Sequence, residues 1–247
     1  MIAFTGLGLT THETRADSRR FTYTYETTTM PKGHWEYEQW VTWKTDKDTD
    51  RDFDRLDFRH EIEWGVTDNL QAAFYVADWR YQDGKSVEDN GAEIRNSAVE
   101  LIYSLADPTT DPLGVALYGE VKLGNEIIAL EAKLLLQKNI GKWVFAWNGI
   151  FEAEWEGERY DEDKGELGQT FGASYQFSPS VLGGFELLHE IEYDDWSEWQ
   201  DHVIYGGPNF SYRSKGPWWI TITAMWQLTD VESEVNFQTR FIMGWDF

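Results

Sequence analysis

The last thirteen residues of the chain place an apolar or aromatic side chain at every second position. The series runs from Val235 to Phe247, with Thr239 as its one polar member, and the residues between are mostly polar or small. A period of two predicts a β-strand with one apolar and one polar face. A water-soluble domain seldom exposes such an aromatic ridge, whereas a strand that closes a barrel in lipid needs one.

The same alternation recurs along most of the chain. Its cleanest example is the stretch from Trp143 to Trp155. Short turns are expected at 67–69, 107–112, 139–141, 178–180 and 215–217, and longer connections at 45–52, 82–91, 157–165, 194–201 and 228–233. Short turns on one rim and long loops on the other are typical of outer-membrane barrels. We therefore predict an all-β fold, a closed antiparallel transmembrane β-barrel of about twelve strands with short periplasmic turns and longer acidic outer loops.

The N-terminal part of the chain leaves the strand count open. Counting both 2–10 and 21–29 as strands gives fourteen, which is the alternative to twelve. We assign residues 1–32 to an N-terminal lead, either a signal remnant or a periplasmic or lumen segment, and residues 33–247 to the barrel. A complete signal peptide would need a basic start and a longer apolar core, and this sequence has neither.

Composition narrows the class of protein. The formal net charge of −23 argues against nucleic acid as a partner, because phosphates would be repelled. No stretch approaches the ~18 consecutive apolar residues of a transmembrane helix. The chain has no cysteine, which excludes disulfides, thiolate metal sites and cysteine catalysis. Aromatic residues make up 16% of the chain, as expected if they form girdles at two membrane interfaces.

Three motifs resemble the opening of a broad group of bacterial porin-like barrels. They are Tyr23-x-Tyr25-Glu26, the stretch Pro31-Lys32-Gly33-x-x-Glu36-x-Glu38-Gln39-Trp40, and Glu61-x-Glu63-x-Gly65-x-Thr67-Asp68-x-Leu70-Gln71. The C-terminal alternation likewise resembles the terminal signal by which outer-membrane barrels are recognised for insertion. Together the matches cover about the first 75 residues and the last 13. The resemblance implies the fold and a bacterial outer-membrane location, but no substrate and no catalytic residues.

Strand parity divides the side chains into two sets. The outward set is expected to place these aromatic residues in the membrane: Trp143, Phe145, Trp147, Phe151, Trp155, Trp218, Phe237, Phe241, Trp245 and Phe247. The inward set is expected to line the lumen with these charged residues: Glu36, Glu38, Asp57, Arg59, Glu61, Glu63, Glu120, Lys122, Glu131, Lys133, Glu152, Glu154, Glu186, Glu190, Glu192 and Arg240.

Acids outnumber bases in the inward set, and two interpretations of this excess compete. The carboxylates either line a water-filled path that favours cations, or pair with arginine and lysine across strands and fill a narrow barrel. An unpaired acid in dry protein would be costly, so the excess favours some water in the lumen.

The sequence offers little for metal or enzyme chemistry. We predict no cofactor, although Ca²⁺ or Mg²⁺ could bind the acidic outer loops, and Asp46-x-Asp48-x-Asp50 has the spacing that begins a calcium loop. That stretch lacks the glycine and the distal glutamate of such a loop. We predict no catalytic residues, and an enzyme at the lipid rim would have to use His202 with Ser197 or Ser211.

The leading functional prediction is a porin-like channel for passive passage of small solutes or ions, with a preference for cations. The expected partners are outer-membrane lipid, lipopolysaccharide and the barrel-assembly machinery, but not nucleic acid. Two alternatives stay open: a barrel enzyme acting on lipid at the rim, and a soluble, tryptophan-rich, sugar-binding β-sandwich.

Overall fold

The computed structural model describes residues 18–87, 90–193, 196 and 202–247. In these residues it contains strands and turns, and no helix long and apolar enough to cross a membrane. The strands are β1 (Trp35–Lys47), β2 (Asp54–Thr67), β3 (Leu70–Asp83), β4 (Gly91–Ala106), β5 (Gly114–Gly124), β6 (Ile127–Ile140), β7 (Trp143–Glu156), β8 (Glu162–Ser178), β9 (Val181–Tyr193), β10 (His202–Arg213), β11 (Trp218–Gln227) and β12 (Val235–Asp246).

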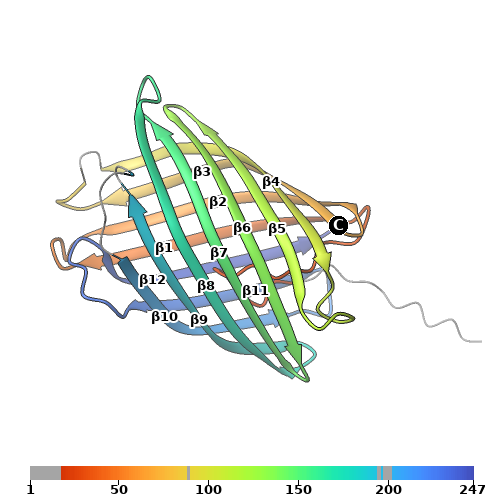
Figure 1. Ribbon diagram of the computed structural model, residues 1–247. Helices are drawn as coiled ribbons and strands as arrows, with labels where there is room; N and C mark the ends of the chain where they lie inside the picture. Colours follow the sequence, from red (N-terminus) through yellow and green to blue (C-terminus); the bar gives the residue numbers. More distant parts are fainter. Residues whose placement is uncertain (1–17, 88–89, 194–195, 197–201) are drawn as a thin grey trace, which may run out of the picture.

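The twelve strands form one closed antiparallel barrel in which each strand pairs with its neighbours in sequence (Figure 1). Closure is made by β1, which pairs with β2 on one side and with β12 on the other, for example Trp40 with Ile242. The prediction of twelve strands is confirmed for the described residues. The fourteen-strand alternative is wrong for residues 21–29, which form no strand, whereas 2–10 lie outside the described residues.

The connections sort by rim as predicted. Two to seven residues join the strands at one rim, at 68–69, 107–113, 141–142, 179–180 and 214–217. The opposite rim carries the connections at 48–53, 84–90, 157–161, 194–201 and 228–234, together with the tight turn at 125–126. Because short turns of such barrels face the periplasm, we call the two ends the periplasmic rim and the outer rim.

Pro208 lies inside a strand, a position that proline seldom occupies. The strand β10 runs through it from His202 to Arg213. Proline has no N–H to donate to a ladder. The ladder between β10 and β9 continues through Pro208, whereas the pairing with β11 lapses between Gly206 and Asn209. The missing donor therefore disturbs one side of the strand only.

The outer surface of the barrel is apolar. Large hydrophobic side chains on nearly every strand are 40% or more exposed, among them Phe74, Leu101, Leu117, Phe210 and Trp226. Water-soluble proteins rarely expose contiguous apolar surface of this extent. A sheet closed on itself also leaves no unpaired edge in hydrocarbon. The barrel is therefore a membrane-spanning one, and the β-sandwich alternative is wrong, because there is one closed sheet and not two packed sheets.

Residues 18–30, which we call the lumen segment, lie inside the barrel as a chain without regular secondary structure (Figure 1, red). Its aromatic residues Phe21, Tyr23 and Tyr25 are each buried against inward-facing side chains of the wall. Just beyond it, Gly33 donates its N–H to the carbonyl of Gly65 at 2.7 Å, which fixes the chain where it enters β1.

Candidate functional site

The tip of the lumen segment is held by one carboxylate near the middle of β9. Glu186 accepts main-chain hydrogen bonds from Thr22 (2.9 Å), Tyr23 (2.8 Å) and Thr24 (3.0 Å). Thr223 on β11 donates its hydroxyl to the same carboxylate at 2.5 Å. Glu186 is fully buried. Successive main-chain N–H groups that converge on one anion form a nest, so this glutamate stabilises the bend at 22–24.

Further main-chain groups of the lumen segment bond to polar side chains of the wall. Asn148 accepts from the N–H of Tyr25 at 2.6 Å and donates to its carbonyl at 3.0 Å. Near the periplasmic rim, the amide oxygens of Gln137 and Gln71 each accept a main-chain N–H at 2.8 Å, from Thr27 and Met30 respectively. A buried backbone without helix or sheet must find partners elsewhere. The wall supplies them, so the segment is seated specifically.

The first arm of the segment is held in the same way. Its carbonyls at 18–20 and 22 accept hydrogen bonds from side chains on β10, β11 and β12. The donors are Arg213 to Ser18 (3.0 Å), Ser211 and Thr221 to Arg19 (3.1 and 2.6 Å), Asn209 to Arg20 (2.6 Å) and Arg240 to Thr22 (3.2 Å).

Arg19 lies among carboxylates of β1 and β2 near the periplasmic rim. It bonds Glu38 at 2.9 Å and Glu63 at 2.8 Å, and Glu61 is 3.7 Å away. The guanidinium also lies over the rings of Tyr25 and Trp40, 4.6 and 4.8 Å from their centroids. These contacts give the segment a second, charged anchor at its first arm.

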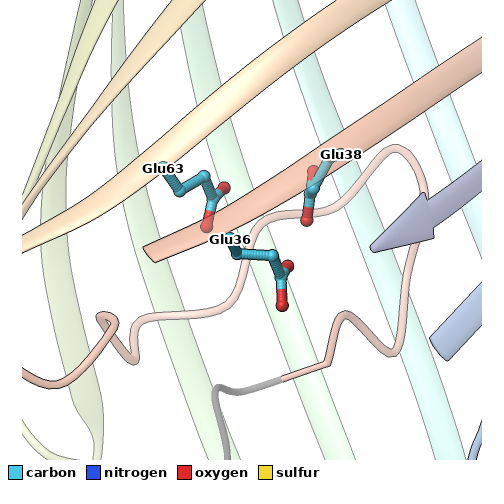
Figure 2. Close-up of side chains that lie close together, drawn as sticks. All are labelled: Glu36, Glu38 and Glu63. Atoms are coloured by element: carbon cyan, nitrogen blue, oxygen red, sulfur yellow. The ribbon is translucent and has the colours of Figure 1, made fainter. Parts of the chain in front are cut away.

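Figure 2 shows Glu36 and Glu38 on β1 and Glu63 on β2, beside the lumen segment. Each offers a carboxylate oxygen within 4.8 Å of the others. Oxygen ligands of this kind suit Ca²⁺ or Mg²⁺. However, Arg19 bonds two of the three carboxylates, and the indole N–H of Trp219 bonds Glu36 at 3.0 Å. A cation would therefore have to displace an arginine that already neutralises the cluster.

Two polar cavities lie on either side of the lumen segment. The smaller, of about 40 Å³, lies between the segment and the periplasmic ends of β2 and β3, and Glu63 and Gln71 line it. The larger, of about 440 Å³, lies toward the outer rim above Trp40 and Arg240. The lumen is thus neither an open tube nor a solid core, because it contains two cavities at different depths, and the segment lines the smaller one.

The charged lining of the larger cavity is divided by strand. The contiguous arc β12, β1, β2, β3, β4 and β5 contributes seven bases: Arg240, Lys44, Arg55, Arg59, Arg80, Arg95 and Lys122. The arc β7, β8 and β9 contributes five acids: Glu152, Glu154, Glu166, Glu190 and Glu192. Opposite charges therefore line different arcs of the wall, and the two arcs meet at the ion pair between Lys122 and Glu152, which are 2.6 Å apart.

The exceptions to this division are locally paired. On the basic arc, Asp57 lies between Arg55 and Arg80, each 2.8 Å away, and Asp78 bonds Arg59 at 3.0 Å. On the acidic arc, Lys164 bonds Glu156 at 2.5 Å. Each of these acids on the basic arc and the lysine on the acidic arc is thus neutralised by a nearby residue of the same arc. The basic arc therefore keeps its excess of bases, and the acidic arc keeps its excess of acids.

The charged residues expected in the lumen fall into four places. Glu38, Glu61 and Glu63 surround Arg19, with Glu36 beside Glu38 and Glu63, and Glu186 holds the segment tip. Glu120, Glu131 and Lys133 lie between the lumen segment and the larger cavity. Lys133 is 3.0 Å from Glu131, and its ammonium group lies over the ring of Tyr25. Asp57, Arg59, Lys122, Glu152, Glu154, Glu190, Glu192 and Arg240 line the larger cavity.

The aromatic residues expected to face the membrane all keep exposed surface. Trp143, Phe151, Trp245 and Phe247 are 41 to 71% exposed. The other six, Phe145, Trp147, Trp155, Trp218, Phe237 and Phe241, are partly exposed.

The outer-loop acids contact donors within the protein. Arg51 bonds Asp46 at 2.9 Å and Asp48 at 2.5 Å. Asp50 accepts the main-chain N–H of Ser86 at 2.7 Å, which joins the loop after β1 to the loop after β3. This hydrogen bond lowers the pKa of the Asp50 carboxyl below its usual value. Metal binding at these loops stays a prediction.

The residues considered for an enzyme site do not come together where they are described. His202 is exposed and lies 3.2 Å from His189, nitrogen to nitrogen. Ser211 is fully buried in the lumen, where its hydroxyl bonds the carbonyl of Arg19. His202 and Ser211 thus lie on opposite faces of one strand. Ser197 lies outside the described residues.

Sequence reasoning missed the uncharged anchors of the lumen segment. Gln71, Gln137, Asn148 and Asn209 are buried and bond its main chain. All four share the inward parity of the charged set, so their polarity at inward positions was the available signal. What the sequence could not indicate is that their partner is a segment of the same chain.

A closed twelve-stranded barrel with an apolar exterior and a polar lumen defines a transmembrane β-barrel of the outer-membrane class. The chain belongs to DUF6662, a family of unknown function, which matches residues 13–240. No curated protein matches the chain by sequence.

Several solved structures share the fold. The crystal structure of the COG4313 outer membrane channel from Pseudomonas putida F1 superposes with a TM-score of 0.68 at 13% identity, covering 92% of this chain and 100% of that chain. The NanC porin superposes with a TM-score of 0.57 at 8% identity, covering 85% of this chain and 98% of that chain. The KdgM porin superposes with a TM-score of 0.51 at 12% identity, covering 86% of this chain and 99% of that chain. At such identities the similarity establishes the fold, that of barrels of the bacterial outer membrane.

Proposed function

We propose that this protein is a narrow, passive, porin-like channel for small solutes or ions across the outer membrane. The observation that carries the proposal is the charged cavity of about 440 Å³ inside a closed membrane barrel. Charged walls in a barrel hold water. A second cavity of about 40 Å³ lies on the periplasmic side of the lumen segment. It supports a solute path that consists of the larger cavity on the outer side and this smaller cavity on the periplasmic side.

The lumen segment sets the expected conductance. The main-chain bonds of residues 22–24 to Glu186 and the ion pairs of Arg19 hold the segment across the lumen. A solute would have to pass a constriction or wait until the segment moves. We therefore expect small, infrequent currents compared with those of a wide, water-filled porin.

The proposed selectivity is a weak preference for cations. Many of the lumen acids are engaged with the segment, and the larger cavity is nearly balanced, with eight bases and seven acids. The preference therefore rests on the net charge of −23 and on the acidic outer loops, which raise the local concentration of cations at the entrance.

The test is a planar bilayer experiment with the purified barrel in a potassium chloride gradient. We expect discrete channels whose reversal potential has the sign of cation preference and whose preference weakens at high salt, because entrance charges are screened. Absence of any conductance from barrels that keep the heat-dependent gel shift would reject the channel. A reversal potential of anion sign would reject the selectivity alone.

The surroundings of the barrel follow from the same proposal. We expect the apolar exterior to contact outer-membrane lipid. We expect the outer rim to contact lipopolysaccharide, with divalent cations bridging its phosphates to the acidic loops. We expect the barrel-assembly machinery to insert the protein by binding the C-terminal strand β12.

A further inference from the structure

The larger cavity pairs two walls of opposite charge, and this arrangement selects for a class of solute. A small cation would contact the acidic wall of β7–β9 but meet repulsion from the arginines opposite, and a small anion would experience the reverse. A molecule that carries both charges can satisfy both walls at once. Discrimination of this kind uses the repulsive wall as much as the attractive one.

Some charges on each wall are not neutralised by their neighbours. Among the described residues, Glu166, Glu190 and Glu192 form no ion pair with lysine or arginine within 4.0 Å, and neither Lys44 nor Arg240 has a carboxylate that close. Arg240 instead donates to Thr42 and to the carbonyl of Thr22. Charged groups in a narrow cavity with low-dielectric walls attract an opposite charge more strongly than in bulk water. These side chains are therefore the ones a solute would meet.

We propose that the larger cavity binds small zwitterions, molecules of amino-acid type with an ammonium and a carboxylate group. The ammonium group lies against Glu190 and Glu192, and the carboxylate lies against Lys44 and Arg240. The cavity volume of about 440 Å³ is within the range of small-molecule sites, about 300–1,000 Å³. The inference rests on the proposed function, since the ligand is a solute in transit, and it names the class of that solute.

The test compares four five-carbon compounds that differ only in end groups: 5-aminopentanoate, glutarate, 1,5-diaminopentane and pentane-1,5-diol. Binding to the detergent-solubilised full-length barrel is measured by isothermal titration calorimetry at low ionic strength. We expect the zwitterion to bind at least about tenfold more tightly than each of the other three, since two favourable charge contacts replace one favourable and one unfavourable contact. Equal binding of all four, or tighter binding of glutarate or the diamine, would overturn the proposal.

Two variants test the walls separately. Glu190→Gln is expected to reduce the preference for the zwitterion over glutarate at least about threefold, and Lys44→Gln to reduce its preference over the diamine by a similar factor. Glu232→Gln in the outer loop and Lys32→Gln near the periplasmic rim change the same charges away from the cavity and are to leave both preferences unchanged. Unchanged preferences in both cavity variants would overturn the assignment of the walls. If either variant loses the heat-dependent gel shift, the four-compound comparison on the native chain still decides.

Bilayer recording on the same preparation separates this inference from the channel proposal. Conductance without a preference for the zwitterion overturns the inference and leaves the channel intact. Preferential zwitterion binding without conductance supports the site and rejects passive passage.

Discussion

Replacement of Glu186 by glutamine is expected to release the lumen segment without unfolding the barrel. The carboxylate accepts three main-chain N–H bonds, and its Oε2 atom alone accepts those of Tyr23 and Thr24, at 2.8 and 3.0 Å. Glutamine keeps one acceptor oxygen, and its NH₂ group would face N–H donors at the other position. The variant Glu186→Gln therefore loses two bonds while the barrel's strand pairing stays intact.

The magnitude follows from those two bonds. A hydrogen bond to a charged group contributes about 1.5–3 kcal/mol, so the gross loss is about 3–6 kcal/mol. Part of it is offset because a neutral amide is less costly to bury than a carboxylate. We expect a net loss of about 2–4 kcal/mol from the seated state, which raises the population of the released state by about 30- to 700-fold, at 1.4 kcal/mol for each factor of ten.

A thiol reporter can measure this release, because the chain contains no cysteine. Thr24 is the suitable position, since it is buried and its hydroxyl has no hydrogen-bond partner among the described residues. In a Thr24→Cys background, the labelling rate by a membrane-impermeant maleimide reports how often the segment leaves its seat. Glu186→Gln is expected to raise that rate by the factor above and to increase the single-channel conductance.

The matched control is Glu232→Gln, which removes one negative charge from an exposed residue of the outer loop between β11 and β12. It is to leave the labelling rate unchanged. If Glu186→Gln and the control label within twofold of each other, while both show the heat-dependent gel shift, the carboxylate does not hold the segment and the reasoning fails.

Three further predictions concern the barrel and its loops. Gly184→Ala would place a Cβ 1.8 Å from the carbonyl oxygen of Ala173, so urea unfolding in vesicles should show a loss of about 1–3 kcal/mol; Gly119→Ala, with open space around it, is the control, and equal losses would contradict the steric argument. Phe151→Arg at the lipid-facing wall should cost about 2–4 kcal/mol in the same assay if the residue lies near the bilayer midplane, and no loss would place it outside the hydrocarbon. The lowered pKa of Asp50 means that its bond to the loop after β3 is intact above the usual aspartate range and is lost as pH falls through the lowered value; the protection factors of that loop against hydrogen exchange should fall only in strong acid, and a fall near neutral pH would refute the assignment.

Much of the wall could be predicted from sequence because the relevant signal is local. Successive side chains of a strand point to opposite faces, so the alternation from Trp143 to Trp155 separates the lipid-facing from the lumen-facing residues without knowledge of any other strand. Turn residues predicted where the strands begin and end, and the lengths of the connections predicted which rim has the short turns. Pro208 marks the limit of a local signal, because whether a proline ends a strand depends on which neighbouring strand its missing N–H would have served.

The contents of the lumen were decided by the tertiary structure alone. Phe21, Tyr23 and Tyr25 alternate with threonine as a strand would, yet they form no strand, because their main chain is bonded by side chains from distant strands. Parity likewise indicates that Glu61 and Glu190 both face inward, but not that one lies beside Arg19 while the other lines a cavity. Those differences depend on depth in the barrel and on which strands closure brings opposite each other, and a period-two pattern contains neither.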